Sequence, residues 1–320
     1  MDDCYRIRVP TPFAVGRVNC YVLHGDGLTL VDPGPASEDS RETLVEGLAE
    51  EGYGVGDVDR VLVTHPHMDH FGDAAAIAAE SGAEVCAHTD AVGWLADPDA
   101  QFEREQDLFE PFLVSMGLPE RLSDTVISLP ETYRDFRDPV TVDRELEEGD
   151  VVDAGVDLEV IHTPGHAPGS VCFLAAGQAL FTGDHLLGHI SPNPLLTTRP
   201  DDPTERTRSL PDYLDALEKI QGIDAPVGRP GHGDPVTDVD GRVAEIIEHH
   251  REREERVANI LAAEGPVTAY DVTQELFPDL PATELFPGMS ETIGHLDLLE
   301  DDGRVAIEER DGAVTYDLAE

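Results

Sequence analysis

The sequence predicts an α+β protein of 320 residues, with a large domain over residues 1–240 and a small domain over residues 241–320. Two observations predict the large domain: short apolar strands recur along it, and helical stretches lie between them. The third observation is a change near the C-terminus, where three short helices and a β-hairpin are expected after a linker helix. This order is typical of a winged-helix-like domain.

The first part of the large domain alternates strands and helices. Apolar runs predict the strands, Ser37 can cap the first helix, and an alanine-rich stretch favours the second helix. The expected elements are strands over Tyr5–Val9 and Val18–Val31 with a hairpin turn at Gly25-Asp26-Gly27, a helix over Ser37–Glu50, a strand over Val61–Val63, a helix over Gly72–Glu80 and a strand around Val85.

A helical insertion over about 91–137 interrupts this pattern, with two or three helices expected between Ala91 and Arg137. It carries a stripe of large apolar side chains at helical spacing. Such a stripe packs against other elements more often than it lines a pocket or forms a lid, so we favour packing. The stripe consists of Phe102, Phe109, Phe112 and Met116.

Strands and long helices resume after the insertion. The expected elements are strands over Leu158–Ile161, Ala179–Phe181 and, more weakly, Ala225–Val227, and helices over Pro203–Gln221 and Asp238–Glu264. The C-terminal elements are helices over Thr268–Phe277, Pro281–Phe286 and Ser290–Glu300, then strands over Val305–Ile307 and Ala313–Tyr316 around a turn at Arg310-Asp311-Gly312.

The charge of the C-terminal segment argues against nucleic acid as a partner. Residues 266–320 hold 14 acidic residues and two arginines, Arg304 and Arg310. A surface that binds phosphates needs positive charge. Packing or contact within a homodimer is therefore the favoured role of this segment, with nucleic-acid binding as the alternative.

The strongest functional signal is a run of metal-binding side chains directly after the strand at Val61–Val63. His65-Pro66-His67-Met68-Asp69-His70 places three imidazoles and a carboxylate within six residues. Pro66 disfavours a helical conformation at His65, so the run begins in a loop. Imidazole and carboxylate ligands without a thiolate suit zinc, iron or manganese. The run therefore predicts a metal site at a strand–loop–helix junction.

Three more candidate ligands follow short strands in the same manner. Glycine precedes each of them and permits a tight turn with close approach of the backbone, and proline precedes that glycine at His166 and His232. Because all four loops follow strands, we expect them to gather at one edge of a sheet. The three candidates are His166 in Thr163-Pro164-Gly165-His166, Asp184 in Thr182-Gly183-Asp184 and His232 in Pro230-Gly231-His232-Gly233.

From about Val18 to Pro235 the chain resembles the metallo-β-lactamase-fold hydrolase superfamily, with glyoxalase II-like members closest in motif style. The motifs that carry the resemblance are H-x-H-x-D-H, T-P-G-H, T-G-D and P-G-H. The resemblance implies an αββα sandwich and two metal ions. By the resemblance, His65, His67 and His166 would hold the first ion, Asp69, His70 and His232 the second, Asp184 would bridge both, and Asp32 would buttress the metal loops.

The resemblance implies hydrolysis by a metal-bound hydroxide, with two zinc ions as cofactors and iron or manganese as alternatives. Asp69 would orient the hydroxide and Asp184 would bridge the ions, so these are the expected catalytic residues. The implied substrate is a small thioester, ester or lactone. Two alternatives stay open: a metal-dependent endoribonuclease, since some members with a C-terminal winged-helix-like domain cleave RNA, and a mono-iron enzyme of the persulfide dioxygenase type.

Composition predicts a soluble cytoplasmic protein without a membrane partner. No apolar run approaches the roughly 18 residues that span a bilayer, and the N-terminus does not resemble a signal peptide. The four cysteines are scattered and form no C-x-x-C pair, which is typical of reduced thiols.

The charge balance is strongly acidic. The chain has 67 Asp and Glu against 21 Lys and Arg, a net charge of −46, and Lys219 is its only lysine. Such a chain repels itself at low ionic strength, whereas molar salt shortens the Debye length to about 3 Å. Because the acids are spread along the whole chain, we interpret them as adaptation to a high-salt cytoplasm, like that of halophilic archaea, rather than as a binding tail.

We predict that the protein loses structure when salt is removed, because repulsion between its carboxylates is then unscreened. Circular dichroism in molar and in millimolar salt tests this expectation. Identical spectra under the two conditions would contradict it.

Overall fold

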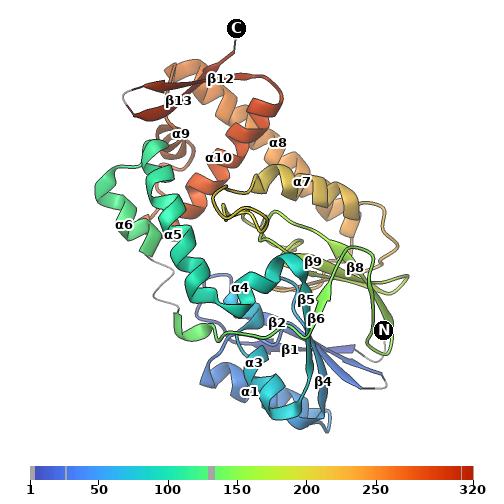
Figure 1. Cartoon of the computed structure of the whole chain (residues 1–320). Helices are drawn as coiled ribbons and strands as arrows, with labels where there is room; N and C mark the ends of the chain where they lie inside the picture. Colours follow the sequence, from blue (N-terminus) through green and yellow to red (C-terminus); the bar gives the residue numbers. More distant parts are fainter. Residues whose placement is uncertain (1–3, 26, 129–133, 311, 320) are drawn as a thin grey trace.

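The computed structural model describes residues 4–25, 27–128, 134–310 and 312–319, and it contains two stacked β-sheets (Figure 1). The first sheet has the order β1-β2-β3-β4-β5-β6; the first three strands pair antiparallel, and β3 to β6 pair parallel. Its strands are β1 Cys4–Val9, β2 Val18–His24, β3 Leu28–Val31, β4 Val58–Leu62, β5 Glu84–His88 and β6 Arg144–Leu146.

The second sheet has the order β11-β10-β9-β8-β7 and is antiparallel except between β10 and β11. Its strands are β7 Val151–Asp153, β8 Asp157–His162, β9 Val171–Ala175, β10 Ala179–Gly183 and β11 Gly228–Pro230. One apolar core lies between the sheets, with side chains such as Leu23 and Leu62 from the first and Val160 and Phe173 from the second.

Helices cover the outer face of each sheet, which gives the four layers of an αββα sandwich (Figure 1). On the first sheet, α1 (Glu38–Glu50) and α3 (Ala74–Ser81) bury Leu44, Leu48 and Ile77 against the strands. On the second sheet, α7 (Ser209–Ile220) and α8 (Val239–Glu264) do the same. The Ser37 side chain accepts a hydrogen bond from the Ser40 amide, so the predicted cap of α1 is confirmed.

The insertion contains α4 (Val92–Ala96), α5 (Pro98–Ser115) and α6 (Glu120–Ser128), and α5 and α6 pack against the C-terminal part of the chain. That part comprises the end of α8, then α9 (Ala269–Leu276), α10 (Leu285–Asp301) and the hairpin of β12 (Val305–Arg310) and β13 (Ala313–Leu318). Both parts contribute to one apolar core, to which Phe109, Phe112 and Met116 belong. The packing interpretation of the predicted stripe is therefore confirmed for these three residues.

Two predicted elements of the large domain begin later in the structure than expected. The helix expected from Pro203 begins only at Ser209, because Pro211 lacks an N–H and is tolerated only in a first turn. The strand expected at Ala225–Val227 is displaced to Gly228–Pro230, beyond Pro226, which cannot donate to a neighbouring strand.

At the C-terminus, the two helices expected over Pro281–Phe286 and Ser290–Glu300 are instead a short 3₁₀ turn, Ala282–Glu284, that leads directly into α10. Pro287 is the third residue of α10, where the backbone has no helical N–H bond to lose, so it does not end the helix. The expected hairpin is present, although Asp26 and Asp311 of the two predicted turns lie outside the described residues. The winged-helix-like domain and the division at residue 240 stay predictions.

Across the part of the chain that the structure describes, every helix is either too short or too polar to cross a lipid bilayer.

We predict that Phe109→Ala lowers the free energy of unfolding by about 3–5 kcal/mol, because Phe109 is 1% exposed in the core that joins the insertion to the C-terminal part. Chemical denaturation in molar salt measures this change. Glu103→Ala, at an exposed position on the same helix, is the matched control. Equal stabilities of the two variants would contradict the assigned core.

Candidate metal centre

The predicted ligands lie in loops at the ends of strands from both sheets. His65, His67, Asp69 and His70 follow β4 of the first sheet, and His67 is the residue before the short helix α2 (Met68–Phe71). His166 follows β8, Asp184 follows β10 and His232 follows β11, all in the second sheet. The expectation that the loops meet at the edge of one sheet is therefore wrong: they meet where the two sheets face each other.

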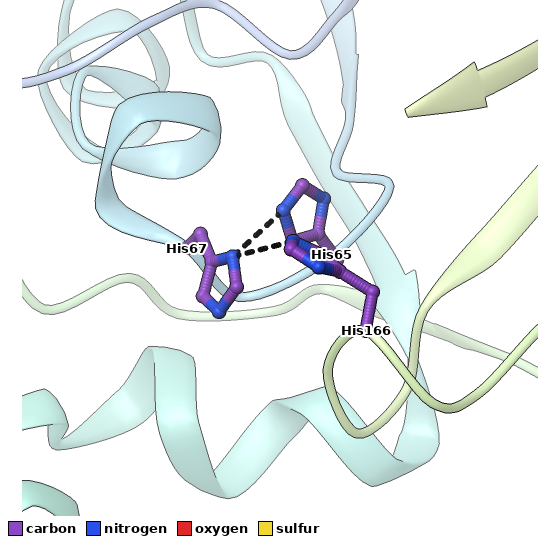
Figure 2. Close-up of side chains that lie close together, drawn as sticks. All are labelled: His65, His67 and His166. Carbon is purple, nitrogen blue, oxygen red and sulfur yellow. Dashed lines mark hydrogen bonds between the residues drawn. The ribbon is translucent and has the colours of Figure 1, made fainter. Parts of the chain in front are cut away.

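Three imidazoles form the first cluster of the site (Figure 2). His67 Nδ1 lies 3.1 Å from His65 Nε2 and 3.0 Å from His166 Nε2. His65 and His166 are buried, and His67 is partly exposed. Nitrogen atoms that bind one metal at about 2.1 Å lie roughly 3–3.5 Å apart, so this spacing fits a metal ion.

A second cluster lies beside the first and consists of Asp69, His70 and His232. His232 Nε2 is 3.2 Å from His70 Nε2 and 3.3 Å from Asp69 Oδ2. All three residues are buried. The set offers one carboxylate and two imidazoles, which again suits a divalent metal.

Asp184 lies between the two clusters. Its Oδ1 is 3.5 Å from His70 Nε2, and its Oδ2 is 3.5 Å from His232 Nε2 and 3.8 Å from His166 Nε2. Oδ1 is buried and has no hydrogen-bond partner among the described residues. An unsatisfied buried carboxylate oxygen is costly in a metal-free site, so this oxygen also fits a position for a metal ligand.

The imidazoles of the site are oriented by hydrogen bonds from their other ring nitrogens. His70 Nδ1 donates to Asp32 Oδ2 at 2.9 Å, His166 Nδ1 to the Asn193 carbonyl at 2.9 Å and His232 Nδ1 to the Arg17 carbonyl at 3.0 Å. Such contacts fix the ring and the tautomer of metal-binding histidines. The two carbonyl contacts have no sequence signal, since any residue can supply a carbonyl.

Asp32 holds the metal loop in place, which is the role expected from the resemblance. Its carboxylate accepts hydrogen bonds from Thr64 N at 2.8 Å and Thr64 Oγ1 at 2.7 Å, in addition to that from His70. Thr64 Oγ1 in turn lies 2.9 Å from His65 Nδ1. The hydroxyl of Thr64 therefore links Asp32 to the first cluster, a contribution that the sequence analysis did not identify.

Two glycines permit the close approach of the loops. At Gly183, which has a φ of +47°, an added Cβ would overlap Thr64 Oγ1. At Gly231, an added Cβ would overlap Asp184 Oδ1 and lie 2.6 Å from His70 Cε1. A larger side chain at Gly231 would thus displace two of the predicted ligands.

The protonation states of the metal-free site differ between the clusters. Burial lowers the pKa of His67 to about 3 and lowers that of His65 and His166, so these rings are neutral and can bind a metal. Burial also lowers the pKa of His70, but the charges of Asp184, Asp69 and Asp32 raise it well above its usual value. Burial raises the pKa of Asp184, yet the charges of His70 and His232 hold it well below its usual range.

Comparisons with known proteins agree with this geometry. The family model described as the metallo-beta-lactamase superfamily matches residues 14–232. The "Probable metallo-hydrolase YqjP" of Bacillus subtilis (strain 168) is 35% identical over 300 residues, which are 93% of this chain and 92% of that protein.

Solved structures extend the likeness to the whole chain. A metallo-beta-lactamase family protein from Thermus thermophilus is similar with a TM-score of 0.83 and 30% sequence identity, and the match covers 100% of this chain and 99% of that one. A shorter match is to the "Atrochrysone carboxyl ACP thioesterase" of Aspergillus fumigatus, which is 29% identical over 140 residues, 40% of each protein.

We predict that Asp32→Asn lowers metal affinity by about 10–100-fold, because the amide cannot accept all three hydrogen bonds that orient Thr64 and His70. Asparagine tolerates the positive φ of 55° at this position, so the backbone is retained. Competition with a chelator measures the affinity. Asp59→Asn is the control, since Asp59 is exposed, lies outside the two clusters and accepts a hydrogen bond from the Leu28 amide. Unchanged affinity in Asp32→Asn would remove the positioning role.

Proposed function

This chain belongs to the metallo-beta-lactamase superfamily of metal-dependent hydrolases, and we propose that it cleaves a small thioester, ester or lactone with two zinc ions. The observation that carries the proposal is the pair of three-residue clusters on either side of Asp184. A dinuclear site needs two ligand sets close together, and the carboxylate of Asp184 lies where it could contact an ion in each set.

We assign the residues to roles as follows. His65, His67 and His166 would hold the first ion, Asp69, His70 and His232 would hold the second, and Asp184 would contact both. When bound, two divalent ions lower the pKa of a water molecule towards 7 and polarise the acyl oxygen. Zinc is proposed because buried neutral imidazoles and carboxylates are its common ligands.

Asp69 is the candidate that orients the attacking water. Burial raises the pKa of its carboxyl, but the positive charge of His70 and the hydrogen bond from His232 lower it by more. The net effect is a pKa below the usual value, so the group is a carboxylate. A carboxylate accepts hydrogen bonds only, which suits it to hold the hydrogen of a water molecule while a lone pair faces the acyl carbon.

Two observations support a small acyl substrate. The chain between Asp184 and His232 holds the helix α7, the short strand β11, loops and a bridge between Thr198 and Arg206, which leaves no room for a large inserted domain. The fungal protein with the partial match is named as a thioesterase. Thioester hydrolysis is therefore the first activity to test.

An endoribonuclease is less well supported because the C-terminal arginines are already paired. Arg304 donates to Glu254 at 2.8 Å and to Glu255 at 2.9 Å, and Arg310 donates to Glu308 at 2.6 Å. Phosphate binding would have to displace these carboxylates. We propose that this segment packs against the insertion instead.

We predict that Asp184→Ala or His67→Ala reduces turnover of a reactive thioester at least about 10³-fold, equivalent to about 4 kcal/mol of transition-state stabilisation, while circular dichroism is unchanged. The assay uses zinc-loaded protein in molar salt and a panel of acyl thioesters, esters and lactones. The exposed Asp224 provides the matched control Asp224→Ala.

Each result has a clear meaning. Substantial turnover by the metal-depleted Asp184→Ala protein would exclude the two-metal assignment. Absence of turnover on the whole panel by the wild-type protein would exclude a small acyl substrate of these classes and make RNA the next substrate to assay.

A further inference from the structure

A second group of buried metal-binding side chains lies outside the site described above, where α8 packs against α10 (Figure 1). It consists of His250 on α8 and of Glu291 and His295, which lie four residues apart on α10. The three residues are 1%, 5% and 0% exposed. None of them has a part in the hydrolytic site.

The spacing of these side chains resembles that of the first site. Glu291 Oε1 is 3.2 Å from His295 Nε2 and 3.5 Å from His250 Nδ1, and the three ligand atoms lie within 4.8 Å of one another. Ligands of one tetrahedral metal are separated by roughly 3–3.5 Å. His250 Nδ1 is buried, faces Glu291 and has no hydrogen-bond partner within the described parts of the chain.

The chemical states of two of the groups suit metal binding. Burial raises the pKa of Glu291, but the neighbouring imidazoles of His250 and His295 hold it well below its usual range, so the group is an anion. Burial lowers the pKa of His295 below its usual value, so its ring is neutral and has a lone pair to offer.

The surroundings of His250 are those of an oriented ligand. Its other nitrogen, Nε2, lies 3.0 Å from Ser191 Oγ, which fixes the ring as a hydrogen bond does for metal-binding histidines. A cavity of about 600 Å³, lined by Ser191, Arg253 and Glu291 among others, lies beside the carboxylate of the cluster.

Arg253 is a neighbour of the cluster whose charge opposes a cation. Its Nη1 donates to Glu291 Oε1 at 2.6 Å. The contacts of Glu291 with Arg253, His295 and His250 all involve Oε1, so a metal ion held by this oxygen shares it with the guanidinium. Any ion bound here must therefore tolerate a guanidinium beside its carboxylate ligand.

We propose that His250, Glu291 and His295 form an additional metal site for zinc or a similar divalent ion. Two imidazoles and one carboxylate leave a fourth position of a tetrahedral ion for water. The ion crosslinks α8 to α10 and, through Ser191, braces the loop whose Asn193 carbonyl orients His166. The role proposed for this ion is structural, because its ligands join two helices.

The test is the zinc content of the full-length protein after gel filtration in molar salt, measured by mass spectrometry. His295→Ala is expected to lower the content by one equivalent, both in the wild-type protein and in a His67→Ala, Asp184→Ala variant that lacks ligands of the hydrolytic site. His249→Ala, which removes the exposed neighbouring histidine on α8, is the control and is expected to lower it by none.

Thermal unfolding provides a second readout. Added zinc is expected to raise the Tm of the His67→Ala, Asp184→Ala variant, and not to do so once His295→Ala is added. Equal zinc contents with and without His295→Ala would overturn the proposal, as would loss of an equivalent in His249→Ala. If His295→Ala fails to fold, Glu291→Gln replaces it, because glutamine keeps the side-chain volume. Zinc content and the zinc-dependent change of Tm of that variant then test the proposal. These outcomes do not depend on hydrolytic activity.

Discussion

The arrangement of the metal loops depends on the hydrogen bonds that the buried carboxylate of Asp32 accepts. This carboxylate accepts hydrogen bonds from the amide and hydroxyl of Thr64 and from His70 Nδ1, so one side chain at the end of β3 positions both ends of the H-x-H-x-D-H loop. Asp32 adopts a φ of 55°, which is uncommon for a residue with a side chain. Three hydrogen bonds to a buried anion offset the cost of this conformation.

The site also requires that the two sheets keep a fixed separation, because its ligands come from both. Tyr21 of the first sheet contributes to this in two ways: its ring contacts Phe181 with centroids 5.3 Å apart, and its hydroxyl donates to the Pro230 carbonyl at 2.9 Å. Pro230 lies two residues before His232. The same core that stabilises the sandwich therefore places the ligands of the second sheet opposite those of the first.

The sequence was sufficient to predict most elements and the residues that gather at the candidate metal centre, because both depend on local patterns. Strands such as β4 and β8 have apolar runs, and the turns after them contain glycine or proline. Local patterns could not locate the start of α7 or of α10, where Pro211 and Pro287 lie in first turns that continue as helices. They also could not identify the carbonyls of Arg17 and Asn193, because backbone acceptors are the same in every residue.

The shared core of the insertion and the C-terminal part has a consequence for synthesis of the chain. Phe109 and Leu299 belong to this core although 190 positions separate them in the sequence. A ribosome makes the chain from the N-terminus. The apolar side chains of α5 and α6 therefore stay exposed to solvent until α9 and α10 have been translated. Contacts of such long range form slowly, and the nascent chain is open to aggregation during that interval.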